Sequence, residues 1–123
     1  MESDERERIV AALAEAFGAA TDATESPELP LHVILPELEL PGPWTPSPTR
    51  ALTIWRNWPA ERPEFYIDHS VVGESEAPPR NPYDAYHLGE TWRGFSFNFP
   101  WPGQNDPVVV VQMWVTRFVV ERS

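Results

Sequence analysis

The chain has 123 residues, no cysteine and a formal net charge of -10, and its nine basic residues are all arginine. This length fits one domain with a hydrophobic core of its own. The lack of cysteine excludes disulfides, thiolate metal sites and a thiol nucleophile. The acidic balance, without a basic cluster, argues against binding to nucleic acid or to an anionic membrane surface.

The termini and the apolar runs give an expectation about location. No apolar run is long enough to span a membrane, and the N-terminus is acidic and charged, unlike a signal peptide. We therefore expect a cytoplasmic protein. The chain has 15 prolines, which predict rigid corners and ordered loops, because Trp, Phe and Val are also abundant.

The first predicted element is a helix over residues 4–17. Asp4 and Glu7 have the spacing of a capping box, and Gly18 is a suitable stop. The predicted apolar stripe consists of Ile9, Val10, Leu13 and Phe17. Residues 19–30 are small and polar, which predicts a linker.

Strands are predicted in the middle of the chain. Residues 31–35 form a short strand candidate, and residues 37–40 alternate like an edge strand or a continuation of that strand. Residues 51–55 and 65–67 are rich in aliphatic and aromatic side chains that suit a sheet. Pro59 and Pro63 between them cannot join a sheet ladder, so they predict a rigid corner. Trp44, in a proline-rich frame, is expected to plug one end of the core.

The C-terminal part is predicted to contain a long loop, a strand and a helix. Residues 69–90 are rich in proline and acidic side chains and read as the loop, and residues 91–97 read as the strand. Asp106 followed by Pro107 is a helix start signal. The predicted buried face of this helix consists of Val108, Val111, Val115, Phe118 and Val119.

These elements predict an α+β fold with an N-terminal helix, about four antiparallel strands in a meander, a long flap loop and a C-terminal helix. Residues 1–123 form one domain in this reading, with the helix at 4–17, the linker at 19–30 and the core at 31–123.

Residues that could carry chemistry are few. Asp68 next to His69, and Asp84 three residues before His87, could each form a carboxylate–imidazole pair. No two histidines have metal-ligand spacing, and no glycine pattern of a nucleophile elbow accompanies Ser70 or Ser96. The residues alone do not indicate catalysis, and we expect no metal and no cofactor.

Aromatic side chains crowd the region from Trp92 to Trp101. Most of them are expected in the core. Trp92 and Trp101, together with Arg93, could instead form an exposed recognition patch, because Trp and Arg dominate binding hot spots.

The order of these motifs resembles the ubiquitin-conjugating-enzyme (UBC-like, RWD-like) fold. The resemblance spans about residue 31 to the C-terminus. It rests on the strand 52–54, the corner Trp58-Pro59-x-x-x-Pro63 and the next strand 65–67. It also rests on the proline-rich loop 78–82, the Trp101-Pro102 pair and the helix that begins at Asp106. His87-Leu88-Gly89, Trp92-Arg93-x-Phe95-Ser96 and Trp101-x-Gly103-x-x-Asp106 are similar to bacterial conjugating-enzyme-like families encoded beside activating enzymes and isopeptidases.

The chain departs from this family at the active site. The family's thioester cysteine would fall near Trp92 to Ser96, and none is present. The His-Pro-Asn triplet is missing, and Asn98 stands near where the bacterial relatives carry a histidine. The degenerate active-site region is therefore His87, Trp92, Arg93, Ser96 and Asn98. A non-catalytic variant, or replacement of a native cysteine, accounts for this.

The resemblance implies an inactive adaptor in a bacterial modification system, such as one acting in phage defence. The expected partners are a ubiquitin-like protein, contacted by Trp92, Arg93 and Trp101, and an activating or active conjugating enzyme, contacted by the first helix. One alternative is a small hydrolase or metal-binding protein that uses His69 or His87 with Asp68 or Asp84. Another is a purely structural subunit.

Overall fold

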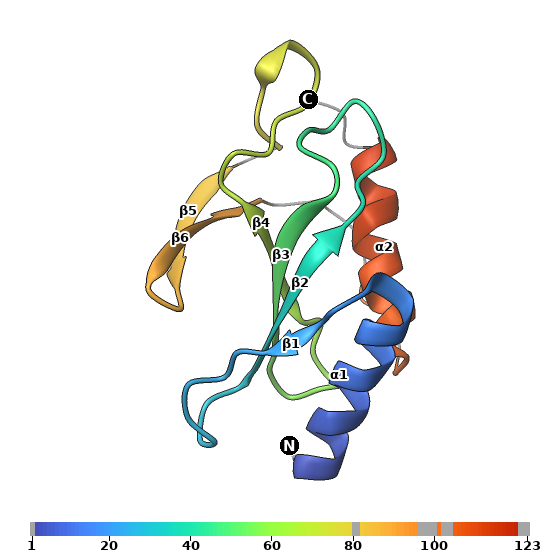
Figure 1. Ribbon diagram of the computed structural model, residues 1–123, viewed down its shortest axis with the longest axis vertical. Coiled ribbons are helices and arrows are strands. Elements are labelled where there is room, and N and C mark those ends of the chain that lie inside the picture. Colours follow the sequence, from blue (N-terminus) through green and yellow to red (C-terminus); the bar gives the residue numbers. More distant parts are fainter. Residues whose placement is uncertain (1, 80–81, 96–100, 102–104, 121–123) are drawn as a thin grey trace.

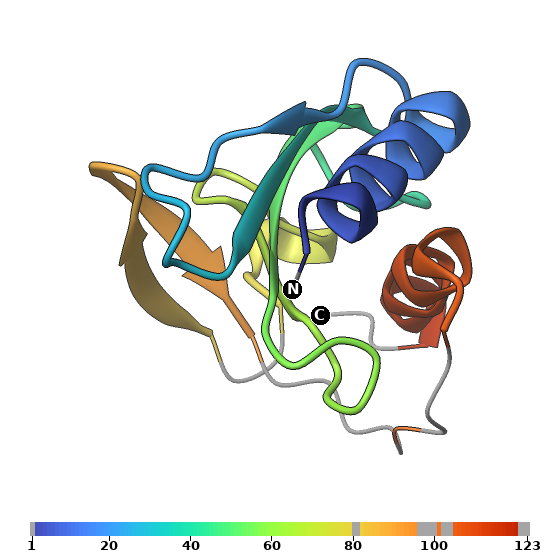
Figure 2. The same ribbon diagram turned by 90° about the horizontal axis from the view of Figure 1, so that it is seen from below.

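One antiparallel sheet carries both helices on the same face (Figures 1 and 2). The structure is a computed structural model that describes residues 2–79, 82–95, 101 and 105–120. The elements are α1 (Ser3–Phe17), β1 (Thr21–Asp22), β2 (Leu31–Leu38), β3 (Thr49–Trp55), β4 (Glu64–Asp68), the 3₁₀ helix η1 (Glu74–Glu76), β5 (Tyr83–His87), β6 (Glu90–Gly94) and α2 (Pro107–Val120). The predicted α+β class with a helix at each end is confirmed.

The sheet has six strands in the order β1-β2-β3-β4-β6-β5, so the prediction of about four strands is wrong. The extra strands lie where the sequence predicted a linker and a long loop. β1 falls within residues 19–30, while β5 and the start of β6 fall within residues 69–90. β5 is largely exposed and polar, so it lacks the apolar alternation that identifies a strand.

The β5–β6 hairpin turns through only two residues, Leu88 and Gly89, with φ of 55° and 76°. Two successive positive φ angles give a turn whose twist matches the strands that it joins. Leucine is unusual at the first of these positions, where Asn or Gly is the common signal. This is why the hairpin was hidden in the sequence.

The helix α1 ends as predicted but begins differently. Its N-cap residue is Glu2, without a side-chain capping bond, so the predicted capping box of Asp4 and Glu7 does not form. At the other end Gly18 adopts a φ of 81° and its N–H donates to the Ala14 carbonyl at 2.9 Å. The predicted stripe is confirmed: Ile9 and Leu13 are buried, and Val10 and Phe17 pack against the same core.

The helix α2 begins as the sequence predicts, because the Asp106 carboxylate accepts a hydrogen bond from the Val108 N–H at 3.0 Å. Its buried face agrees with the prediction at Val111 and Phe118 but also includes Trp114, and the side chain of the predicted Val119 lies outside the described residues. Val108 and Val115 are only half-buried. The buried residues of this helix are Val110, Val111, Trp114 and Phe118. A run of apolar residues fits several helical faces, and the largest side chain decides which one turns inward.

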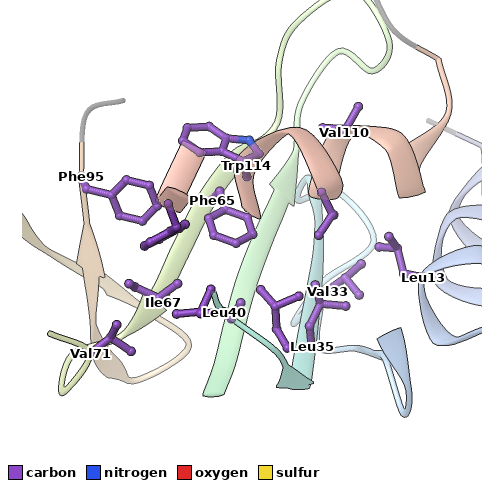
Figure 3. Packing of buried hydrophobic residues seen from close by; sticks show 14 of the residues in the cluster. Leu13, Val33, Leu35, Leu40, Phe65, Ile67, Val71, Phe95, Val110 and Trp114 are labelled. Atoms are coloured by element: carbon purple, nitrogen blue, oxygen red, sulfur yellow. The ribbon is translucent and has the colours of Figure 1, made fainter. Parts of the chain in front are cut away.

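The main core lies between the helices and the sheet (Figure 3). Phe65 of β4 stacks on Trp114 of α2 with ring centroids 5.4 Å apart, and Phe95 meets both rings edge-on. Trp44 closes one end of this core, with 1% of its surface exposed, and its indole N–H donates to the Phe118 carbonyl at 2.7 Å. The expected role of Trp44 as a plug is confirmed.

A second, smaller core lies on the opposite face of the sheet. It consists of Leu52, Ile54, Tyr66 and Trp92, with Ile34, Ala85 and Leu88 packed around them. The β5–β6 hairpin curves toward this face, away from the helices (Figure 2). Both faces of the central strands are therefore covered, one by helices and one by a hairpin.

We predict that Trp44→Ala destabilises the protein by about 3–5 kcal/mol, because it leaves a cavity and removes the partner of the Phe118 carbonyl. Chemical denaturation measures this free energy of unfolding. Tyr86→Ala, at a residue that is 72% exposed, is the aromatic control and should change stability by less than about 0.5 kcal/mol. Similar effects of the two substitutions would contradict the assignment of Trp44 to the core.

Candidate functional site

Trp92, a predicted partner contact, is fully buried. It is 0% exposed and belongs to the second core, and its indole N–H donates to the His87 carbonyl at 3.2 Å. The guanidinium of Arg50 lies over its ring, 4.5 Å from the centroid. The expectation of an exposed Trp92 is wrong, because strand alternation in β6 directs this side chain into the second core.

Arg93 points to the other side of β6 and is half-buried. It pairs across the ladders with Ile67 of β4 and Asp84 of β5. Its guanidinium donates to the His69 carbonyl at 3.3 Å. Arg93 therefore lies at the root of the hairpin beside His69 and Asp84, on the surface that the sequence assigned to partner binding.

Trp101 lies against the proline corner between β3 and β4. Its ring is 6.0 Å from that of Trp58, and its indole N–H donates to the Ala60 carbonyl at 3.1 Å. Trp58 in turn meets Trp55 edge-on at 4.8 Å. Trp101 is partly buried by these contacts, and the rest of its surface is exposed. The candidates Ser96 and Asn98 lie outside the described residues.

Neither pair predicted from neighbours in the sequence, Asp68 with His69 or Asp84 with His87, forms; His69 pairs with Asp84 instead. The His69 Nε2 lies 2.7 Å from an Asp84 carboxylate oxygen, and both side chains are exposed. His87 does not pair with Asp84, because residues three apart on β5 point to opposite faces. His87 instead lies near Tyr66 and His32, with ring centroids 4.8 and 6.2 Å away.

A serine–histidine–aspartate triad is not assembled at His69. The Ser70 hydroxyl donates to the Asp68 carboxylate at 2.6 Å, so it is directed away from the neighbouring imidazole. Across the described ranges no group of three or more His, Cys, Asp or Glu side chains could hold a metal ion.

An ion-pair cluster that the sequence did not reveal borders the second core. Arg50 bridges Asp68 at 2.6 Å and also Glu90, so it links β3, β4 and β6. Burial raises the pKa of Asp68, but hydrogen bonds from Ser70 and Arg50 outweigh it and lower that pKa to about 2. The same two carboxylates raise the pKa of Arg50. Strand alternation places Arg50 and Asp68 on the same face of the sheet. Arg50 also reaches Glu90 because the β5–β6 hairpin folds beside them.

A second polar chain runs beside it on β3 and β4. The Tyr66 hydroxyl donates to Glu64 at 2.6 Å, and Arg56 pairs with the other oxygen of Glu64. Burial and the bond to Glu64 raise the pKa of Tyr66. For Glu64, burial raises the pKa, but the bonds from Tyr66 and Arg56 outweigh it and the net pKa is lowered.

A groove of about 760 Å³ lies between the end of α1, the end of β2 and α2. Its apolar lining includes Phe17, Leu38 and Val115, and Glu37 and Glu39 contribute carboxylates. The region around α1 therefore has an open groove with both apolar and acidic side chains in its lining.

No protein-family model, curated protein or solved structure matches this chain. Among the described segments, no helix has the length and apolar character needed to cross a bilayer. Any functional conclusion must therefore come from the residues described above.

We predict that the acid stability of the protein depends on Asp68. Because its pKa is lower in the folded state than the unfolded value near 4, its stabilising effect is present above pH 4 and is lost as the pH falls toward 2. Asp68→Asn should flatten this acid branch, measured by denaturant unfolding across that pH range. The exposed Glu25→Gln is the control and should keep the branch; an unchanged branch in Asp68→Asn would contradict the prediction.

Proposed function

We propose that this chain is a non-catalytic ubiquitin-conjugating-enzyme-like adaptor. It binds or positions a ubiquitin-like protein, or its activating or conjugating partner, in a bacterial modification system such as one acting in phage defence. The observation that carries the proposal is the contact between Trp101 and the Trp58–Pro63 corner. These are two of the motifs on which the family resemblance rests, and they are far apart in the sequence.

The order of the elements adds support. An N-terminal helix precedes an antiparallel sheet, β3 and β4 are joined by the proline corner, and a helix capped by Asp106 follows. This is the order that the resemblance implies, although β5 and β6 form a hairpin within the segment expected to be a flap.

Two features of the side-chain composition support an adaptor role over an enzymatic one. Carrying a modifier as a thioester needs a thiol, and the sequence has no cysteine. The chain also has no lysine, so no side-chain amine on it can accept a modifier. A protein that works beside a conjugation machine would thereby avoid being modified itself.

The surfaces assigned to partners are refined by the geometry. With Trp92 buried, Arg93 and Trp101 remain for the ubiquitin-like protein. The activating or conjugating partner is assigned to α1 and the groove beside it, where Glu37 and Glu39 favour a basic partner surface.

A small hydrolase is the second candidate, and the exposed His69–Asp84 pair is the observation that favours it. An oriented imidazole can act as a general base. This reading predicts that His69→Gln abolishes an activity, whereas the adaptor reading predicts that Arg93→Glu weakens partner binding. In a purely structural subunit neither His69→Gln nor Arg93→Glu would have an effect.

We predict that the chain binds the ubiquitin-like protein encoded beside it and forms no thiol-sensitive adduct when the activating enzyme and ATP are added. Arg93→Glu should weaken this binding at least about tenfold, or about 1.4 kcal/mol, by replacing a cation with an anion in the contact. Calorimetry measures the affinity, and gel electrophoresis with and without reductant detects an adduct.

Arg8→Glu is the matched control, because Arg8 is an exposed arginine on α1. It should leave binding of the ubiquitin-like protein unchanged, because α1 is assigned to the other partner. A chain that binds neither kind of neighbour, or equal effects of the two charge reversals on the ubiquitin-like protein, would rule out the adaptor assignment.

A further inference from the structure

Two histidines meet on the face of the sheet opposite the helices. His32 lies on β2 and His87 at the end of β5, strands that are not neighbours in the sheet. Their ring centroids are 6.2 Å apart, with the planes inclined at 64°. The hairpin brings them together because it curves toward this face (Figures 1 and 2).

The position of each ring follows from strand alternation. His32 pairs with Ile54 across the β2–β3 ladder, and Ile54 belongs to the second core. On β5, His87 points to the same side as Ala85, which packs against that core. Both imidazoles therefore face the space between the hairpin and the central strands.

The imidazole of His32 is held by its backbone surroundings. Its Nδ1 lies 2.7 Å from the Pro30 carbonyl oxygen, which can only accept a hydrogen bond, so Nδ1 carries the proton. In the neutral tautomer with the proton on Nδ1, the lone pair is on Nε2. Metal-binding histidines have this arrangement: one ring nitrogen donates to a carbonyl and the other faces the metal.

The imidazole of His87 is also available. No hydrogen bond to another described residue engages its ring nitrogens, and its ring packs beside that of Tyr66. A neutral imidazole is the form that binds a metal ion.

We propose that His32 and His87 together form a binding site for a divalent transition-metal ion of the kind that prefers imidazole, such as zinc, nickel or copper. The chain supplies two ligands. The carboxylate of Glu64, which interacts electrostatically with His87, already accepts a hydrogen bond from Tyr66 and pairs with Arg56. The remaining coordination positions are therefore open to water or to a ligand from a bound partner.

Binding at this site would fasten the β5–β6 hairpin to β2, two parts of the sheet that share no ladder. The metal would hold them by bonds that the apolar contacts of the second core do not provide. Because a metal ion binds the folded arrangement and not the separated histidines of the unfolded chain, it should also raise the stability of the whole domain. The site does not rest on the adaptor function proposed above.

The test uses the whole chain, freed of metal by chelation, and zinc chloride as the probe. We expect calorimetry to detect one zinc ion per chain and the thermal unfolding midpoint to rise with zinc concentration and to fall back when EDTA is added. His87→Gln, at the more exposed ligand, should weaken zinc binding more than about tenfold. His32→Gln should have the same effect.

The third histidine provides the control. His69→Gln removes the imidazole paired with Asp84 and should leave zinc binding unchanged. In the wild-type chain, zinc should shift the imidazole NMR signals of His32 and His87 but not those of His69, a readout that needs no variant to fold. The proposal would be overturned if zinc did not bind. It would also be overturned if zinc shifted only the His69 NMR signals, or if only His69→Gln lost zinc binding.

Discussion

Alternation of side chains along β4 is the constraint on which both halves of the protein depend. Phe65 and Ile67 point to the helices, while Glu64, Tyr66 and Asp68 point to the opposite face. A strand of five residues thus contributes to two cores. A shift of register by one residue would exchange the two sets and bury the carboxylates under α2, so packing on the two faces specifies one register. The helices and the hairpin are the two covers that this strand requires.

The hairpin is the element that gives the opposite face its chemistry. It buries Trp92 against the central strands, brings Glu90 to Arg50, and places His87 beside His32 and Tyr66. The β4–β6 ladder that joins it to the rest of the sheet comprises only two residue pairs, Ile67 with Arg93 and Asp68 with Trp92. The side-chain contacts on the inner face therefore carry much of its attachment. Polar groups in this position are costly unless they are paired, and the Arg50 and Glu64 clusters satisfy that need.

The proposed adaptor function and the proposed metal site occupy different parts of this architecture. Arg93, Trp101 and α1 lie on the side of the sheet that carries the helices or at its edge, whereas His32 and His87 lie on the other face. The two proposals can therefore be tested by separate substitutions. Partner binding and zinc binding would be linked only if a partner supplied one of the open coordination positions.

Local patterns in the sequence were enough to predict α1 with its stop at Gly18, the strands that became β2, β3 and β4, and the start of α2 at Asp106 and Pro107. Each of these depends on residues close together in the chain. They also suggested that Asp68 pairs with His69 and Asp84 with His87, whereas the structure pairs His69 with Asp84, 15 residues away in the chain. The tertiary structure alone decided that Trp114 faces the core, that Trp92 is buried and not exposed, and that His87 joins His32. These outcomes depend on the curve of the β5–β6 hairpin and on competition between helical faces, which arise from contacts between distant segments and leave no periodic signal in the sequence.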